Sequence, residues 1–515
     1  MSADEPTPWW QRRVTLAALV VAAILPLLWP PLPPLTDLPG HVGRWHIAMA
    51  GPESPLRQYY RIEWSLIGNL GTDLLAIPLA RLIGLAAAAR LIVMLIVAIS
   101  MAGMLWLARE AHGRVPPTAL FALPFVHAWP FQMGFVNFVL AQGLCFAALA
   151  LWLRLGRSER LALRAALFAP IGIALWITHS AGWGLFGLMA FGAELARLRE
   201  QGRRWGAAIG GAILACLPLA LPILIMLALR PAAARANETG DWFNLAAKQL
   251  WIIASLRDRW QWFDIASLAA LPLVLYIAAR EPRLGYARLL GWPALFCVAG
   301  FLLLPRLLLG GSYVDMRMTP AIWILALLAI RPPPPGRLAN ALALAGLAFF
   351  AARIAATTLS FALVTAEQQS ELAAVNHIPR GAPVLALVHR PCLTPWSDIR
   401  PEHLAAHAII ARDAFVNEQW AIPGQHYLTI RHSRAMPFAA DPSQLVYPVG
   451  CKGQGRDLPH AIATFPRAAF SHVWIIGSRL ADPGRSGLLQ VWTNGHSALY
   501  EVVGGAGVRR VERSR

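Results

Sequence analysis

Charged residues are scarce in this chain. Asp, Glu, Lys and Arg make up 14% of its 515 residues, hydrophobic residues make up 57%, and the mean hydropathy is +0.51. An ordinary soluble domain carries about 25% charged residues, so this composition excludes a purely soluble protein. A membrane-spanning helix needs roughly 20 mostly apolar residues, and the sequence contains many such runs. It therefore predicts a polytopic α-helical membrane protein.

Lysine is almost absent, because Lys248 and Lys452 are the only two and arginine supplies the other basic residues. The net charge of +18 would suit a nucleic-acid partner. The arginines, however, lie mainly in short loops between apolar runs, which is the pattern that orients a membrane protein. We therefore expect membrane lipids, and no nucleic acid, as partners.

Three common catalytic motifs are also missing. The sequence has no G-x-x-x-x-G-K-[ST] run for nucleotide phosphates, no G-x-S-x-G turn for a serine nucleophile and no H-E-x-x-H metal helix. His403 and His407 are four residues apart, but no glutamate lies between them. We expect these two histidines to lie on a surface face.

About eleven apolar runs are candidate membrane spans. The first follows Arg12 and Arg13 and ends without a small-residue cleavage site, so we interpret it as a retained helix and not a signal peptide. The candidates are residues 14–29, 88–108, 118–131, 134–153, 163–178, 181–198, 206–229, 265–279, 289–305, 319–330 and 338–364.

Arginines predict the orientation of these spans. They concentrate in alternate loops, and the positive-inside rule places such loops in the cytoplasm. The N-terminus is then inside, and the C-terminal tail is outside. The arginines are Arg109, Arg114, Arg154, Arg157, Arg160, Arg164, Arg197, Arg199, Arg203, Arg204, Arg280, Arg283, Arg288, Arg331 and Arg337.

The chain divides by composition into two predicted domains. Residues 1–365 form the membrane domain, whose first outward loop, 31–87, contains an amphipathic stretch at 74–83 suited to the membrane interface. Further outward segments are 230–264 and 309–317. The polar tail, 366–515, predicts a small α/β domain of ordinary size outside the membrane. Its strand-like runs are 384–388, 472–476 and 488–492, and 402–413 is compatible with a helix.

The five cysteines fall into two groups. Cys145, Cys216 and Cys297 lie in apolar runs and are expected to be buried. Cys392 and Cys451 lie in the polar tail. If the tail is extracytoplasmic, these two can form a disulfide.

Asp37 is the first candidate for chemistry, because an ionisable residue at the membrane edge is costly to keep there. Its carboxylate could act as a general base or a cation ligand, or simply cap a helix. His41 and Arg44 follow at the spacing of one helical face. They predict either a catalytic cluster with Asp37 or a structural ion-pair cluster. Glu63 lies in the same outward loop as a possible substrate contact.

Four further residues are substrate-binding candidates in other outward loops. Arg317 can bind a phosphate through two oxygens, or can pair with Asp315 at the interface. Lys248 is a second phosphate candidate, or an interfacial residue that meets lipid headgroups. His179, at an outward turn between two helices, is either a ligand or a hydrogen-bonded structural histidine.

Two of these segments resemble motifs of the glycosyltransferase C (GT-C) superfamily. Residues 36–44, Thr-Asp-Leu-Pro-Gly-His-Val-Gly-Arg, resemble the D-x-P-x-H-x-x-R pattern that opens many bacterial members. Residues 313–317 resemble their later aspartate-x-arginine loop. GT-C enzymes are polytopic, with an acidic residue in a long first outward loop and often a soluble C-terminal domain. The resemblance covers the architecture of most of residues 1–365.

The resemblance implies a glycosyltransferase of the bacterial inner membrane. Asp37 would be the catalytic carboxylate, and Arg317 or Lys248 would hold the donor phosphate. The implied donor is a polyprenyl-phosphate sugar, and the implied acceptor is a lipid or glycan of the cell envelope on the periplasmic side. Since Leu38 follows Asp37 where some members have a second acid, we assign no metal ligands and leave a divalent cation open as a cofactor.

Two other functional classes fit the same composition. A lipid or polysaccharide transporter would also have many helices, but with more polar residues inside them. A non-catalytic envelope assembly factor would use the tail to bind a partner. Loss of function on Asp37→Asn would favour the enzyme, and dependence on the tail alone would favour the assembly factor.

Overall fold

The computed structural model describes residues 7–229, 238–392, 394–451 and 455–503. Three predicted features fall partly or wholly outside the described residues. They are residues 230–237 of the outward segment 230–264, Lys452, and residues 504–515 of the tail domain.

The chain forms two compact units that do not follow one another along the sequence. The first unit comprises Met1–Trp29, Leu66–Leu75 and Arg90–Phe361. The second comprises Pro30–Ser65, Ala76–Ala89 and Ala362–Arg515. The tail therefore shares its unit with much of the predicted first outward loop.

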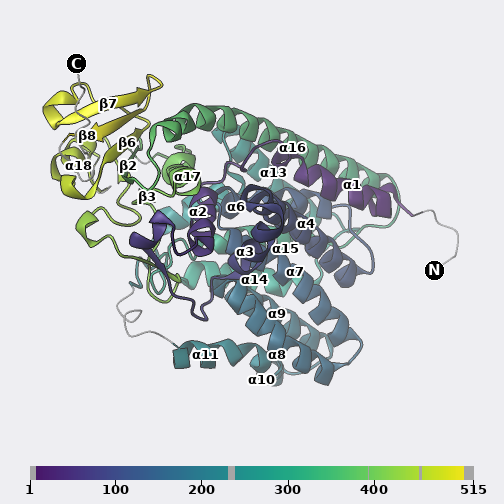
Figure 1. The fold of residues 1–515 in the computed structure, drawn as a ribbon. Helices are drawn as coiled ribbons and strands as arrows, with labels where there is room; N and C mark the ends of the chain where they lie inside the picture. Colours follow the sequence, from purple (N-terminus) through teal and green to yellow (C-terminus); the bar gives the residue numbers. More distant parts are fainter. Residues whose placement is uncertain (1–6, 230–237, 393, 452–454, 504–515) are drawn as a thin grey trace, which may run out of the picture. The chain divides into compact units, whose positions relative to one another are not determined.

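The first unit is helical (Figure 1), and the residue ranges of α3, α4 and α16 are divided between the two units. Gly84, with φ of +85°, separates α3 from α4, since that backbone conformation ends a helix at little cost to glycine. The helices are α1 (Arg13–Ile24), α3 (Gly71–Ile83), α4 (Leu85–His112), α5 (Ala119–Ala122), α6 (Trp129–Gln132), α7 (Val136–Arg157), α8 (Leu161–Thr178), α9 (Ser180–Glu200), α10 (Trp205–Cys216), α11 (Leu221–Leu229), α12 (Leu245–Ile253), α13 (Gln261–Arg280), α14 (Arg288–Leu303), α15 (Thr319–Leu328) and α16 (Arg337–Leu372).

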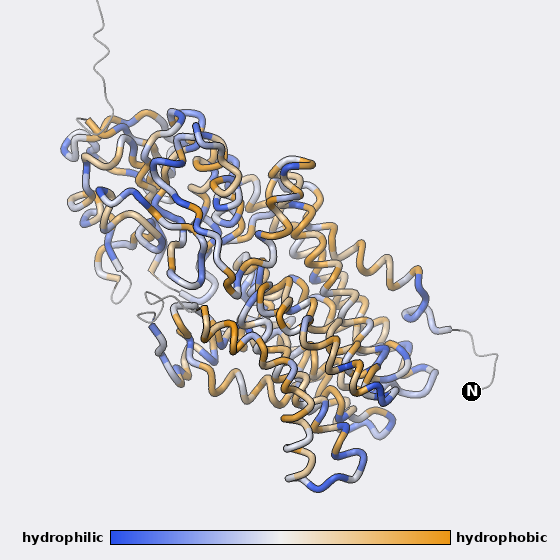
Figure 2. Tube along the Cα trace, turned by 60° about the horizontal axis from the view of Figure 1, so that its bottom comes forward, coloured by the Kyte–Doolittle hydropathy of each residue, from blue (hydrophilic) through white to orange (hydrophobic). Residues whose placement is uncertain are grey.

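Six helices within the described residues are long and apolar enough to cross a membrane. Figure 2 shows hydrophobic residues along the long helices and hydrophilic residues in the loops that join them. Four shorter apolar helices accompany them, so the predicted count of about eleven spans stays a prediction. The six are Leu85–His112, Val136–Arg157, Leu161–Thr178, Trp205–Leu229, Gln261–Arg280 and Arg337–His377.

Two of the predicted spans differ from simple membrane helices for physical reasons. Residues 118–131 are broken into short helical turns, because Pro124 and Pro130 cannot continue a helix. The predicted span 181–198 is a long helix, α9, that packs against α7, α8, α10 and α14 (Figure 1). A helix covered by protein on several sides needs a less apolar surface than one that faces lipid.

The second unit is built around a β-sheet with strand order β3-β2-β6-β8-β7. The strands β3, β5 and β6 each pair with β2 in parallel, and β8 pairs with β6 and β7 in antiparallel. A separate pair, β1 and β4, joins the first outward loop to the tail. The strands are β1 (Tyr60–Ile62), β2 (Pro383–His389), β3 (Phe415–Val416), β4 (Leu428–Ile430), β5 (Leu445–Val446), β6 (His472–Ile476), β7 (Leu488–Thr493) and β8 (Ala498–Val502), and the helices are α2 (Leu38–Met49), α17 (Ala406–Arg412) and α18 (Leu458–Thr464).

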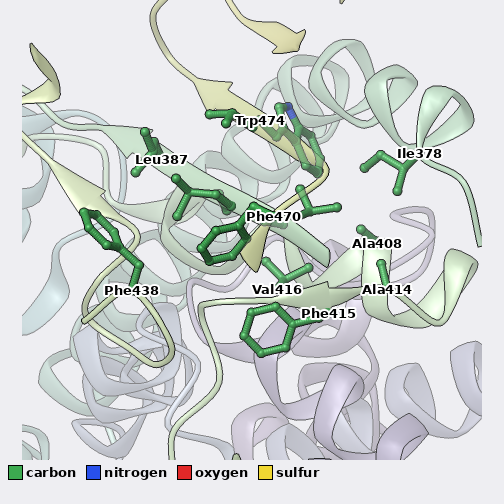
Figure 3. Close-up of a cluster of buried hydrophobic side chains, with 14 of the residues drawn as sticks. Ile378, Leu387, Ala408, Ala414, Phe415, Val416, Phe438, Phe470 and Trp474 are labelled. Atoms are coloured by element: carbon green, nitrogen blue, oxygen red, sulfur yellow. The ribbon is translucent and has the colours of Figure 1, made fainter. Parts of the chain in front are cut away.

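One hydrophobic core holds the second unit together. Its centre includes Phe415, Phe470 and Trp474, which lie close together in Figure 3. Ile47 and Tyr60, from the first outward loop, belong to the same core. The hydroxyl of Tyr60 also donates a hydrogen bond to the carbonyl of Val416 at 2.9 Å. The loop segment is thus an integral part of this unit.

The secondary structure predicted for the tail is confirmed. The predicted strands 384–388, 472–476 and 488–492 correspond to β2, β6 and β7, and the predicted helical stretch 402–413 contains α17. Cys392 and Cys451 form a disulfide, with their Cα atoms 5.5 Å apart. Cys145 and Cys297 are buried free thiols and Cys216 is a half-buried one.

Candidate active site

Asp37 lies at the N-terminus of α2. Pro39 falls in the first turn of this helix, where a missing backbone N–H costs nothing. The carbonyl of Asp37 accepts the first helical hydrogen bond, from the amide of His41 at 3.0 Å. Within the described helix α2, the Asp37 side chain makes no capping hydrogen bond. The carboxylate is therefore not committed to the capping role that the sequence left open.

His403 is a cation that faces this carboxylate. It lies just before α17 and is buried, with only 4% of its side chain exposed. Its Nδ1 donates to Oε2 of Glu418 at 2.6 Å. Burial lowers the pKa of His403, but the hydrogen bond and charge of Glu418, followed by the charges of Asp37 and Asp441, raise it to about 10. His403 is therefore an imidazolium at neutral pH.

Two carboxylates share the other nitrogen of His403. Its Nε2 lies 3.8 Å from Oδ1 of Asp37 and 3.7 Å from Oδ1 of Asp441. The side chains of Asp37 and Asp441 are 15% and 23% exposed, so solvent reaches both. Gln444 donates a hydrogen bond to Oδ1 of Asp441 at 2.9 Å and fixes its position. The carboxylates of Asp37 and Asp441 are thus both partly exposed and both lie near the buried imidazolium of His403.

His41 and Arg44 form a buried pair on α2. Nη2 of Arg44 lies 2.8 Å from Nδ1 of His41. Because a guanidinium can only donate, Nδ1 is the acceptor and Nε2 carries the proton. Burial, then the charges of Arg44, His426 and His403, lower the pKa of His41 well below its usual value. A neutral His41 is suited to donate a hydrogen bond, which favours a positioning role over the predicted catalytic one.

Glu63 lies at the surface of the same unit. Its carboxylate pairs with Arg61 at 2.9 Å, and both side chains are about half exposed. Such exposed pairs contribute little stability. This geometry gives no support to the predicted substrate contact at Glu63, which stays a prediction.

Lys248 and Asp315 form a closed ion pair in the first unit. Nζ of Lys248 donates to Oδ2 of Asp315 at 3.0 Å and to the carbonyls of Phe301 and Leu304 at 2.7 and 2.9 Å. Oδ1 of Asp315 accepts the amide of Met316 at 2.8 Å. An ammonium has three N–H groups, and all three are used here. The pair therefore favours a structural role over the predicted phosphate contact of Lys248.

Arg317 and His179, also in the first unit, lie side by side. Nη1 of Arg317 is 2.8 Å from Nε2 of His179, and its guanidinium stacks on the rings of Phe135 and Phe138. Nδ1 of His179 accepts the amide of Ala181 at the start of α9. In a neutral ring the proton is then on Nε2, so two N–H donors meet. An anionic oxygen beside these two groups would be attracted by the guanidinium charge and could accept a hydrogen bond from either.

The sequence did not predict the tail residues of the second-unit site, which are His403, Glu418 and Asp441. The expectation that His403 and His407 lie on a surface face was wrong, since His403 is buried and burial lowers the pKa of His407 to about 4. A signal was present. Asn417, Glu418 and Gln419 are three consecutive polar residues directly after the parallel strand β3. Ligand sites collect at the carboxyl ends of parallel strands.

The next question is whether side chains are arranged to bind a metal ion. In the described ranges, no group of three or more His, Cys, Asp or Glu side chains is arranged to hold a metal ion. The divalent cation that the sequence left open stays a prediction.

Comparison with known proteins identifies the fold. No protein-family model matches the sequence, and no curated protein matches it. The structure of ArnT from Cupriavidus metallidurans in the apo state matches with a TM-score of 0.51 and 15% identity, over 95% of this chain and 97% of that one. The chain has the ArnT fold. ArnT bound to undecaprenyl phosphate, from the same organism, gives a TM-score of 0.49 and 14% identity over 96% and 99% of the two chains.

The match covers most of both chains, so it establishes the fold that this chain shares with ArnT. Identity of this size establishes fold alone. The activity has to be argued from the residues of the site.

Proposed function

We propose that this chain is a membrane glycosyltransferase that moves a sugar from a polyprenyl-phosphate donor to a hydroxyl or amine of a cell-envelope acceptor. One observation carries the proposal: the carboxylate of Asp37 is accessible, does not cap its helix and faces the imidazolium of His403. The ArnT fold supports the reaction class, and the motif around Asp37 supports the donor class.

In this proposal Asp37 is the general base. Its carboxylate takes the proton of the acceptor hydroxyl or amine as that atom bonds to the anomeric carbon of the sugar. The bond between the anomeric carbon and the phosphate oxygen breaks, and polyprenyl phosphate leaves with the electron pair. The positive charge of His403 offsets the negative charge of Asp37 and Asp441. A positioned base of this kind contributes roughly 10²- to 10⁴-fold to the rate.

We propose a separate role for Arg317 as a phosphate contact. Its guanidinium carbon lies 4.4 Å from the ring centroid of Phe135 and 5.4 Å from that of Phe138, and its Nη1 lies 2.8 Å from Nε2 of His179. Arginine suits phosphate because its planar fork reaches two oxygens at once.

The proposed location is the bacterial inner membrane, with the N-terminus inside and the second unit in the periplasm. The arginine-rich loops support this orientation through the positive-inside rule. The disulfide between Cys392 and Cys451 supports an oxidising compartment for the tail, because disulfides are rare in the cytosol.

The test is a turnover assay on the purified chain in lipid. The protein is incubated with a panel of polyprenyl-phosphate sugars and an envelope lipid extract as the source of acceptor. Release of free polyprenyl phosphate is then measured for the wild type and Asp37→Asn. We expect wild-type turnover and at least a 100-fold loss in Asp37→Asn. Absence of turnover with every donor would contradict the transferase.

Asp457→Asn is the matched control. Asp457 also lies at a helix N-terminus of the second unit, but its side chain caps α18 through the amide of His460 at 2.7 Å. Asparagine caps a helix as well as aspartate does, so this variant is expected to keep wild-type turnover. Equal turnover in all three proteins would remove Asp37 from catalysis. Dependence on the tail with indifference to Asp37→Asn would indicate an assembly factor.

A further inference from the structure

A half-buried tryptophan, Trp420, lies at the centre of the second-unit site. Its ring centroid is 4.4 Å from that of His403, 5.3 Å from that of His41 and 6.1 Å from that of His426. The guanidinium carbon of Arg44 is 5.9 Å from the same ring. Trp420 thus lies near His403, which faces the carboxylates of Asp37 and Asp441, and near His41 and Arg44 of α2.

The position of the indole is fixed by the backbone of α2. A Cβ atom added to Gly40 would lie 2.7 Å from Cη2 and 2.9 Å from Cζ3 of Trp420. Gln419, the preceding residue, donates a hydrogen bond to the carbonyl of Gly40 at 3.1 Å. The edge of the indole therefore rests on α2 within one turn of Asp37, where only glycine leaves room for it.

The side chain of Trp420 is half-buried, so part of the indole is open to solvent. The N–H of a partly exposed indole can donate to a ligand. His41 adds a second donor, because its Nδ1 accepts from Arg44 and its Nε2 carries the proton.

We propose that Trp420 forms the floor of a monosaccharide subsite beside Asp37. The indole contacts the C–H face of the sugar ring, Nε1–H of Trp420 and Nε2–H of His41 donate to sugar oxygens, and the carboxylate of Asp441 accepts from a hydroxyl. The choice of a sugar rests on the proposed function. The sugar can belong to the donor or to the acceptor, and both present the same chemistry to the site.

The surface chemistry around the indole suits a sugar. The imidazoles of His41 and His403 and the carboxylates of Asp37 and Asp441 supply hydrogen-bonding groups near an aromatic ring. An aromatic face combined with hydrogen-bond donors and acceptors suits a ligand that has both C–H and O–H groups.

The test measures sugar binding directly and does not depend on turnover. Saturation-transfer NMR is recorded on the full chain in nanodiscs with a panel of neutral and amino methyl glycosides. We expect contact signals from ring C–H protons with the wild type, weaker signals with Trp420→Phe, and none with Trp420→Leu. Wild-type signals are expected from Trp64→Leu, which removes an exposed tryptophan stacked on Tyr427 in the same unit. Equal signals from the wild type and Trp420→Leu, or none with any glycoside, would overturn the subsite.

Steady-state kinetics separate this proposal from the proposed function. In the release assay, Trp420→Leu is expected to raise KM about tenfold for one substrate, either the donor or the acceptor. A tenfold change is about the size expected for one lost aromatic contact. The substrate whose KM rises is the one whose sugar contacts Trp420. An unchanged KM for both substrates would refute the subsite and leave the transferase intact. Glycoside binding without turnover would refute the transferase and leave the subsite intact. Should Trp420→Leu not fold, the graded response of Trp420→Phe carries the test.

Discussion

Each unit of this protein contains a buried cation with carboxylate partners, and the two are built differently. In the first unit, Lys248 uses all its N–H groups on Asp315 and two carbonyls, and both oxygens of Asp315 are engaged. In the second, His403 is tightly bonded only to Glu418, while Asp37 and Asp441 stay nearly 4 Å away and partly exposed. Both clusters would look alike in a sequence.

The difference separates an ion pair that holds structure from one that is available for chemistry. A closed pair satisfies each charge within the protein, so a substrate finds no group to contact. In the second unit, solvent reaches the side chains of Asp37 and Asp441, so a ligand can contact their carboxylates. Buried charge alone is therefore a weak guide to function, and the degree to which its partners are already satisfied is a better one.

The largest expected effect comes from breaking the closed pair. Asp315→Asn leaves the ammonium of Lys248 buried without its counter-charge, which we expect to cost about 3–5 kcal/mol of stability. Asp37→Asn leaves the Glu418 contact of His403 in place and should lower stability by less than about 1 kcal/mol. Thermal unfolding in nanodiscs measures both.

The double change Lys248→Met with Asp315→Leu is the control for that comparison. It removes both charges and keeps similar volume, so most of the lost stability should return. A double variant no more stable than Asp315→Asn would show that the pair is not the source of the loss.

Removing the disulfide should have the next largest effect, confined to the second unit. Cys392 and Cys451 are 59 residues apart, and closing a loop of that size stabilises by about 2–4 kcal/mol. Cys392→Ser with Cys451→Ser should lower the unfolding midpoint and reduce turnover. Cys216→Ser, at a half-buried free thiol, is the control. An unchanged midpoint in the double serine variant would contradict the expectation.

Alkaline pH should weaken the open cluster specifically. The folded-state pKa of His403 is raised to about 10, above the usual value near 6.5. Its stabilisation is therefore complete below about pH 6.5 and is lost as the pH rises toward about 10. We expect the unfolding midpoint of the wild type to fall between about pH 7 and 9. The pH dependence should be flatter in His403→Gln, and parallel curves for the two proteins would contradict the charged state of His403.

The smallest expected effect tests the contact between Gly40 and Trp420. Alanine in a helix is ordinarily favoured over glycine by about 1 kcal/mol. At Gly40 the added Cβ would meet the indole, so we expect a net loss of about 1–2 kcal/mol. Gly51→Ala, in the same unit and with nothing within 4 Å of the added Cβ, should be near neutral. Equal stability of the two variants would show that the indole yields to the added methyl group.

Local patterns predicted much of the fold. The tail strands β2, β6 and β7 were found because continuous runs of β-branched and aromatic residues are a local signal. The broken stretch 118–131 was not, because hydropathy averages over the prolines that interrupt it. The joining of the first outward loop to the tail sheet, through Tyr60 and the pairing of β1 with β4, depends on contacts that no local window contains.

The sequence predicted Asp37 as a site residue but did not predict its partners in the tail. Asp37 stood out because it follows an apolar run, where a carboxylate is costly. His403 was set aside because its local spacing to His407 matched no metal motif. Its partners, Glu418 and Asp441, lie in separate turns of the tail, and Asp37 lies near the other end of the chain. Long-range convergence of this kind requires the fold.

The disulfide has a consequence for the maturation of the protein. The loop between Cys392 and Cys451 contains every tail residue of the site, including His403, Trp420 and Asp441. A newly made chain in a reducing cytosol lacks this cross-link, and the cross-link forms only where an oxidant is present. In the proposed function, completion of the site is thus tied to an oxidising compartment, and a molecule that stays reduced is expected to lack turnover.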